Sequence, residues 1–113
     1  VVQISGTIEK GLAAFVDRVM EEAELDNIDA VIFEIDTPGG VLDAALVIRD
    51  AVLYSEVKTI AFINPRAISA GALISLATDH IVMVEGGTLL GTLGDGRFLL
   101  RKVDSTVLNR PTY

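Results

Sequence analysis

The chain has 113 residues, half of them hydrophobic, and its formal net charge is −7 at pH 7. This length suffices for one small domain with an apolar core. The acidic balance argues against binding to nucleic acid or to an anionic membrane, because both repel negative charge. The sequence has no cysteine and one histidine, which excludes disulfides, a thiolate nucleophile and a metal site rich in either residue. We therefore expect protein or small-molecule partners and no metal.

No segment predicts a membrane span. The longest apolar run lies within residues 67–77, well short of the roughly 20 residues that cross a bilayer. The chain opens directly in a strand-like stretch without a signal peptide, so we expect the sequence to be trimmed from a longer protein.

The first half of the chain predicts a strand, a helix, a strand and a second helix. Residues 1–5 have strand character. Residues 9–25 place apolar side chains at the spacing of a helix with one buried face, namely at Leu12, Phe15, Val16, Val19, Met20 and Ala23. Residues 30–36 are β-branched and almost continuously apolar, as in an interior parallel strand. A turn through Gly39 and Gly40 follows, and residues 41–54 return to helical spacing.

The second half repeats this pattern. Residues 59–63 predict a strand, which ends in a turn up to Ser69, and small and apolar residues to position 77 predict a helix. Residues 80–84 predict another strand, and the glycines of residues 87–91 predict a turn. Strands that alternate with helices indicate an α/β domain with a mainly parallel sheet and right-handed βαβ crossovers.

Two predicted turns are candidates for a functional site. The carboxyl ends of parallel strands share one sheet edge, so the turns at Gly39 and Ser69 should open on the same side. The backbone N–H groups of Gly40 and Ala70 could then converge beside the Ser69 hydroxyl, which is the requirement for an oxyanion hole. The ordinary alternatives are that Ser69 caps the helix and that Gly39 serves only a tight turn. The residues leave both interpretations open.

Three motifs in order carry a family resemblance: DTPGGVLDAA at residues 36–45, PRAISAG at residues 65–71 and GTLLG at residues 87–91. Together they resemble the amino-terminal protease domain of NfeD-type membrane-bound serine proteases, stomatin-operon partners in the Clp protease/crotonase superfamily. The resemblance runs from the first strand to about Val107. It implies that residues 1–113 form a single domain of Clp protease/crotonase-like fold, truncated at both ends.

The resemblance also implies an activity. Members are endopeptidases with a Ser–Lys dyad, need no cofactor, and cut hydrophobic segments of membrane-associated proteins such as stomatin-like partners. The family further implies a homodimer or larger assembly. The full-length protein would be membrane-associated through segments outside this chain, with the present domain soluble and extracytoplasmic.

On this resemblance, Ser69 is the nucleophile, the N–H groups of Gly40 and Ala70 form the oxyanion hole, and Lys102 is the base. A lysine accepts the serine proton only when neutral, so its pocket must be poorly solvated. The other two lysines, Lys10 and Lys58, are expected at the surface. Substrate contacts are expected from a small, mostly apolar group of residues: Gly39, Val41, Leu42, Ile68 and Leu73.

The sequence departs from the family at one place. Lys102 follows Ser69 by 33 residues, which is shorter than the family pattern, and the difference falls near residues 92–95. Either the protein has a deletion there or the sequence omits a loop beside the site, and we favour the omitted loop. The family also continues beyond Tyr113 with further helix and sheet elements.

Other interpretations are weaker but stay open. His80 with Asp79 or Asp36 suggests a Ser-His-Asp triad, yet it follows Ser69 by only 11 residues and begins a strand, so we expect a structural role. Asp36 is expected to bond N–H groups of its own turn. Rival functions are a crotonase-like acyl-CoA enzyme and a non-catalytic assembly or substrate-binding module.

Overall fold

The computed structural model describes residues 1–91 and 106–109. Helices and strands alternate as predicted up to residue 83, and two further strands follow. The elements are β1 (Val2–Ser5), α1 (Lys10–Leu25), β2 (Ala30–Thr37), α2 (Leu42–Leu53), β3 (Lys58–Ile68), α3 (Ala70–Ala77), β4 (His80–Met83), β5 (Thr88–Leu90) and β6 (Thr106–Asn109).

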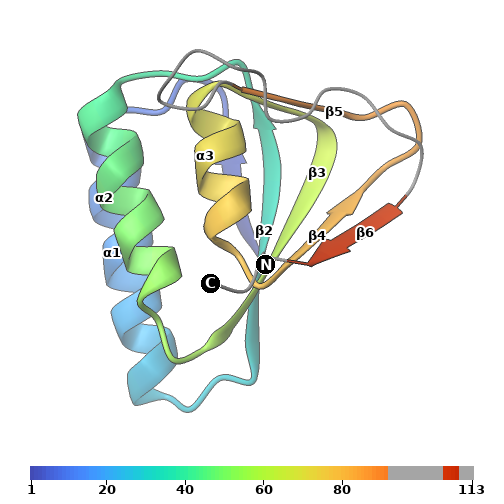
Figure 1. The fold of residues 1–113 in the computed structure, drawn as a ribbon. Helices are drawn as coiled ribbons and strands as arrows, with labels where there is room; N and C mark the ends of the chain where they lie inside the picture. The colour runs from blue at the N-terminus through green and yellow to red at the C-terminus, as the bar shows by residue number, and fades with distance from the viewer. Residues whose placement is uncertain (92–105, 110–113) are drawn as a thin grey trace.

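The strands form one sheet in the order β1-β2-β3-β4-β6, with β5 beside the second half of β3. β1 to β4 are parallel, and β6 runs antiparallel to β4. Because β1 to β4 lie side by side in chain order, crossovers of one hand place every connecting helix on the same face of the sheet. Figure 1 shows α1, α2 and α3 together on that face. The carboxyl ends of the parallel strands therefore meet at a single edge, from which α3 departs.

The core lies between this sheet and the three helices. Alternate residues of β2, among them Phe33 and Ile35, are fully buried against the helices. One stripe of α1 faces them, made of Ala13, Val16, Met20 and Ala23. Phe15, predicted to be in this stripe, is 41% exposed, and the Arg18 guanidinium lies 5.9 Å from the centre of its ring. Neighbouring residues on a helix point about 100° apart, so Phe15 and Val16 cannot both face the core centre.

The prediction for the end of β3 was wrong. We expected the strand to stop at residue 63, but β3 continues to Ile68. Its second half gains a non-local partner, because Arg66 pairs with Thr88 and Ile68 with Leu90. The predicted glycine turn at residues 87–91 is thus mostly strand β5, and the turn lies at residues 85–86. Local composition could not reveal this pairing, since the ladder hydrogen bonds come from a distant segment.

Candidate active site

The ends of β2 and β3 bring the two predicted turns into contact. Thr37 pairs with Ala67 at the end of the ladder, and Gly39 follows in a left-handed conformation with φ of +119°. A Cβ atom built on Gly39 would lie 3.1 Å from Cβ of Ser69 and 3.3 Å from the carbonyl oxygen of Ile68. Only glycine fits there without displacing a neighbour. The prediction that both turns open at one sheet edge is confirmed.

Ser69 occupies a strained turn between β3 and α3. Its φ of 56° and ψ of −112° are outside the regions that a non-glycine residue favours. The turn is held from both sides: the Ser69 N–H donates to the Leu90 carbonyl of β5 at 2.7 Å, and the Ser69 carbonyl accepts from Ala72 and Leu73 at 3.0 and 3.2 Å. A serine on such a turn presents its hydroxyl outward, as nucleophiles of several hydrolases do.

The Ser69 hydroxyl does not cap the helix. Although Ser69 precedes α3, its side chain makes no hydrogen bond to the first helical turn, and the residue is exposed. The capping interpretation is therefore wrong for the side chain. The physical reason is the positive φ, because capping residues normally have extended backbone.

Two N–H groups beside Ser69 are available to an oxygen atom of a ligand. Ile8 forms an isolated parallel bridge with Gly40, in which the Ile8 N–H donates to the Gly39 carbonyl and its carbonyl accepts from the Val41 N–H, each at 2.9 Å. This pattern turns the N–H of Gly40 itself away from Ile8. Within residues 1–91, no backbone or side-chain acceptor bonds the N–H of Gly40 or of Ala70. The described structure thus leaves one donor next to Ser69 in the chain and one next to Gly39, the residue that contacts Ser69.

Asp36 does not support its own turn, contrary to the prediction. Its carboxylate accepts a hydrogen bond from Nε of Arg66 at 3.1 Å, in an ion pair whose two side chains are both about half exposed. The buried hydroxyl of Thr37 serves the turn instead and accepts the Gly39 N–H at 3.1 Å. Successive residues of a strand point to opposite faces, so only one of this pair can face the turn from inside.

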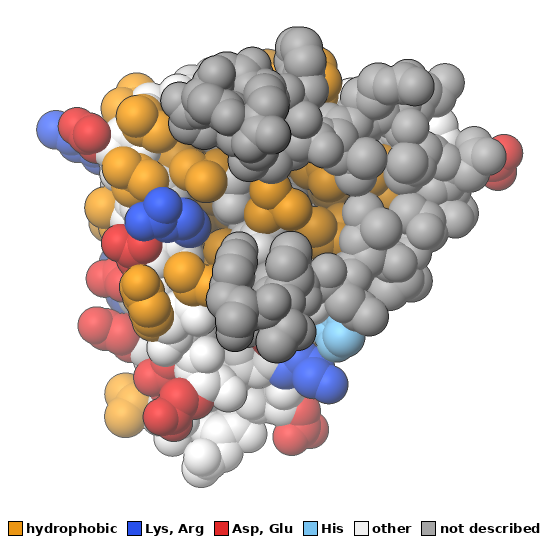
Figure 2. Space-filling model, viewed as in Figure 1, with side chains coloured by type: hydrophobic (Ala, Val, Ile, Leu, Met, Phe, Trp, Pro, Cys, Tyr) orange, Lys and Arg blue, Asp and Glu red, His pale blue; other side chains and the backbone are white. Residues whose placement is uncertain are grey.

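We call the contact between Gly39 and Ser69 at the ends of β2 and β3 the junction. The residues predicted to contact an apolar substrate lie around it and differ in exposure. Val41 and Leu42, which lead from Gly40 into α2, are 49% and 62% exposed. Ile68 and Leu73 are half-buried on either side of Ser69. Hydrophobic side chains gather over α2 and α3 in Figure 2, so the helices beside the junction present an apolar surface.

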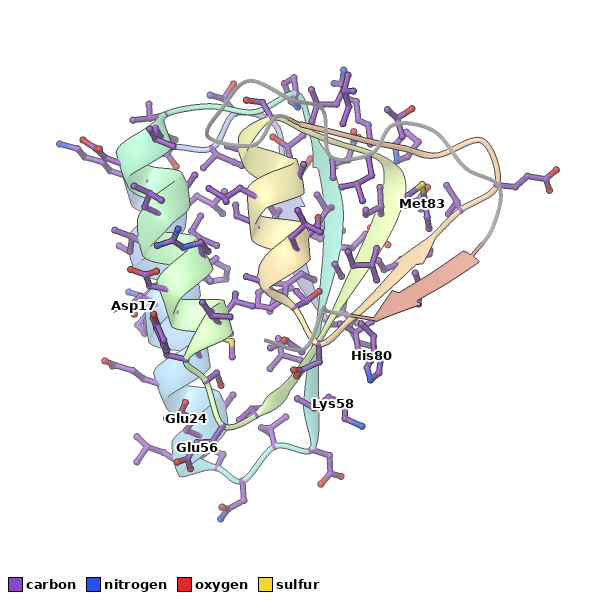
Figure 3. All side chains as sticks on the ribbon, viewed as in Figure 1. Asp17, Glu24, Glu56, Lys58, His80 and Met83 are labelled. Carbon is purple, nitrogen blue, oxygen red and sulfur yellow. The ribbon has the colours of Figure 1, made fainter. Side chains whose placement is uncertain are left out.

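The remaining candidates lie elsewhere. His80 begins β4 and pairs with Ile60, near the amino ends of the strands and opposite the edge of Ser69. Figure 3 shows it there with Lys58, far from the start of α3. The Asp79 carboxylate accepts the Thr59 N–H at 2.9 Å. The structure therefore does not assemble a triad with His80, in agreement with the prediction.

The predicted base, Lys102, lies outside the described residues. Of the other lysines, Lys58 is exposed at the amino end of β3, and Lys10 is exposed where α1 begins. Both are surface groups, as predicted.

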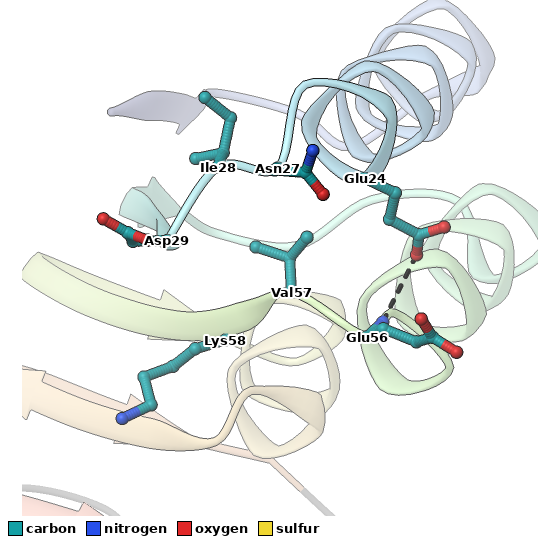
Figure 4. Close-up of a pocket in the computed structure, with 7 residues that line it drawn as sticks. All are labelled: Glu24, Asn27, Ile28, Asp29, Glu56, Val57 and Lys58. Atoms are coloured by element: carbon teal, nitrogen blue, oxygen red, sulfur yellow. Dashed lines mark hydrogen bonds between the residues drawn. The ribbon is translucent and has the colours of Figure 1, made fainter.

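A pocket lies at the edge opposite Ser69 (Figure 4). Its lining is mostly polar and charged, with two apolar residues: Glu24, Asn27, Ile28, Asp29, Glu56, Val57 and Lys58. The Glu24 carboxylate accepts the Glu56 N–H at 3.3 Å.

Within the described part of the chain, no group of three or more His, Cys, Asp or Glu side chains is placed to hold a metal ion. No helix there has the length and apolarity to span a membrane.

A mainly parallel sheet with its helices on one face, and a strained turn from β3 into α3, give the chain a Clp protease-like α/β fold. Among solved structures, ClpP1 from Listeria monocytogenes matches with a TM-score of 0.66 at 22% identity, covering 74% of this chain and 55% of that one. The 1510-N membrane protease specific for a stomatin homolog from Pyrococcus horikoshii matches with a TM-score of 0.70 at 34% identity, covering 82% of this chain and 47% of that one.

The chain belongs to the family described as "NfeD1b, N-terminal domain", whose model matches residues 1–96. Its relatives include the membrane protein NfeD1b of Bacillus subtilis, 39% identical over 89 residues, and the membrane-bound protease PH1510 of Pyrococcus horikoshii, 37% identical over 94 residues. The matches cover 79% and 80% of this chain but only 20% and 21% of those relatives. The chain thus spans about a fifth of their length, and the predicted resemblance is confirmed.

Proposed function

We propose that this chain is the protease domain of a membrane-bound serine endopeptidase, with Ser69 as the nucleophile. The observation that supports this most is the contact of Gly39 with Ser69, because the residues that follow them, Gly40 and Ala70, have N–H groups without an acceptor within the described residues. Oγ of Ser69 attacks the carbonyl carbon of the scissile peptide, and the N–H groups of Gly40 and Ala70 bind the resulting oxyanion. The amine product leaves, and water then releases the acyl group from the serine.

Lys102 is the proposed general base that completes a Ser–Lys dyad. It takes the proton from the Ser69 hydroxyl and returns it to the leaving amine. Solved structures of the 1510-N stomatin-specific protease include a serine-to-alanine and a lysine-to-alanine mutant, which fits a role for both residue types in that protein. In the sequence of that protease, these two residues are separated by more positions than the 33 between Ser69 and Lys102. A larger separation is expected if the present sequence omits a loop before Lys102.

The proposed substrates are hydrophobic segments of membrane-associated proteins such as stomatin-like partners. The lysine mutant of the 1510-N protease is described in complex with a substrate peptide, and that enzyme as stomatin-specific. In this chain the exposed side chains of Val41 and Leu42 would contact apolar substrate residues, with Gly39, Ile68 and Leu73 nearer the serine.

The proposal extends to the protein's organisation. Residues 1–113 would form a single protease domain that works as a homodimer or larger assembly. The domain would be soluble and extracytoplasmic, and membrane segments elsewhere in the protein would anchor it. The names of the relatives as membrane proteins support the anchoring.

A fluorophosphonate probe tests the nucleophile. We expect the intact protein to be labelled at Ser69 and the Ser69→Ala variant to lose both labelling and hydrolysis of an apolar peptide. Ser5→Ala is the matched control, because the Ser5 side chain is exposed at the end of β1 and its hydroxyl makes no hydrogen bond within the described residues. Labelling that survives Ser69→Ala would refute the assignment. Binding of the peptide without labelling or cleavage would favour a non-catalytic module, and turnover of an acyl-CoA thioester would favour a crotonase-like enzyme.

A further inference from the structure

Thr37 links the three segments that build the junction. The residue is fully buried at the end of β2, and its hydroxyl donates to the carbonyl of Gly6 at 2.5 Å while it accepts the N–H of Gly39 at 3.1 Å. One hydroxyl group thereby joins the segment after β1 to the segment that carries Gly40.

The methyl group of the same side chain contacts the helix that follows Ser69. A Cβ atom built on Gly71 would overlap Cγ2 of Thr37, so the first turn of α3 lies directly on this methyl group. Gly39, bonded to the hydroxyl, packs in turn against Ser69. Thr37 thus contacts both segments that carry the proposed oxyanion-hole donors.

We infer that Thr37 is a positioning residue that sets the N–H of Gly40 relative to Ser69. Its two functional groups act at different places: the hydroxyl holds the Gly39 segment, and the methyl group supports α3. Oxyanion donors contribute only when they lie within hydrogen-bond distance of the developing charge, so movement of the Gly39 segment should lower the rate of acylation more than it changes substrate affinity. This inference rests on the proposed function.

Three variants of the intact protein separate positioning from stability. Thr37→Val keeps the shape and the methyl contact but removes both hydrogen bonds, whereas Thr37→Ser keeps the hydroxyl and removes the methyl group. Thr59→Val is the matched control. Thr59 is also buried, and its hydroxyl bonds Asp79 at the opposite end of the sheet.

We expect Thr37→Val to lower kcat and the rate of fluorophosphonate labelling by about ten- to a hundred-fold, the scale for a displaced catalytic group, with KM changed less than about three-fold. Thr37→Ser should retain activity within about three-fold. Thr59→Val should lower thermal stability as Thr37→Val does and leave kcat unchanged. Equal losses of kcat in Thr37→Val and Thr59→Val, or none in either, would overturn the inference.

Amide hydrogen exchange gives a readout that does not need activity. Thr37→Val should accelerate exchange of the Gly39 N–H at least about ten-fold relative to the wild type, because its acceptor is lost, and Thr59→Val should not. Unchanged exchange at Gly39 in Thr37→Val would refute the role of the hydroxyl. If Thr37→Val shows this acceleration but the wild-type protein is not labelled at Ser69, the proposed function is refuted. The placement of the Gly39 segment by Thr37 is then still supported.

Discussion

Gly39 and Ser69 touch across the ends of two neighbouring strands, so closely that a side chain on the first would press on the second. A Cβ atom on Gly39 would stand 3.1 Å from Cβ and 3.6 Å from Oγ of Ser69. The contact joins the end of β2 to the start of α3, and it fixes how far the proposed nucleophile lies from the N–H of Gly40. The spacing of these groups therefore depends on a residue without a side chain.

Gly39→Ala should impair the site more than the fold. The alanine must adopt a φ of +119°, which costs at least about 1 kcal/mol, and its methyl group must displace Ser69 or the Gly40 segment. We expect labelling of Ser69 to slow by about a hundred-fold, measured with the fluorophosphonate probe under first-order conditions.

Gly86→Ala is the control for backbone strain. Gly86 also has a positive φ, of +76°, but an added Cβ there meets none of the described residues within 4 Å. It should lose comparable stability and label at the wild-type rate. A Gly39→Ala variant that also labels at the wild-type rate would contradict a functional contact between Gly39 and Ser69.

Gly71→Ala should destabilise the protein by a clash that a second substitution removes. Its new methyl group would overlap Cγ2 of Thr37, whereas its next neighbours, Cβ of Ala67 and the Thr37 carbonyl oxygen, would be at 3.6 and 3.8 Å. We expect a loss of about 1–3 kcal/mol in the free energy of unfolding, as for other overpacked sites, measured by urea denaturation.

Thr37→Ser should suppress this loss, because it removes the methyl group that clashes. The clash needs both the methyl group added at Gly71 and the methyl group of Thr37, so the double variant should be more stable than the sum of the single changes predicts, with a coupling energy of about 1 kcal/mol or more. Additive losses would show that α3 moves as a whole and thereby relieves the clash that Gly71→Ala creates.

The sequence predicted the order of elements and the edge at which the turns meet, because the apolar periods of residues 9–25 and 41–54 and the continuous apolarity of residues 30–36 are local signals. It did not predict that β3 continues through Pro65, since β5 supplies the pairing from a distant segment. We also expected Asp36, not Thr37, to support the turn. Side chains alternate between the two faces of β2, so only one of these two residues points inward. Which one does so depends on the face of the sheet that the helices cover.

The conformation of Ser69 was likewise beyond sequence reasoning. Its positive φ follows from hydrogen bonds to Leu90 on one side and to α3 on the other, and no local propensity of serine favours it. The role of Thr37 could have been suspected from a polar residue at the end of an apolar strand, but its partners Gly6 and Gly71 come from two other elements.

Arg66→Ala should change stability little. The Arg66 and Asp36 side chains are 49% and 44% exposed, and ion pairs with this exposure contribute less than about 1 kcal/mol. We expect a decrease within that range in the free energy of unfolding from urea denaturation, and a smaller difference in about 1 M salt, where charges are screened within about 3 Å. A salt-independent loss above about 2 kcal/mol would mean that Arg66 acts through packing against β5.

Replacement of Lys102 tests the proposed base through the chemistry of its amine. A neutral lysine can accept the Ser69 proton, whereas the guanidinium of arginine stays protonated. Lys102→Ala and Lys102→Arg should therefore both lower the labelling rate by about 10²–10⁴-fold, the usual contribution of a general base. Lys58→Ala, at the opposite end of β3, should label as the wild type does. Wild-type labelling by Lys102→Arg would show that Lys102 supplies positive charge or packing, and that another group removes the serine proton.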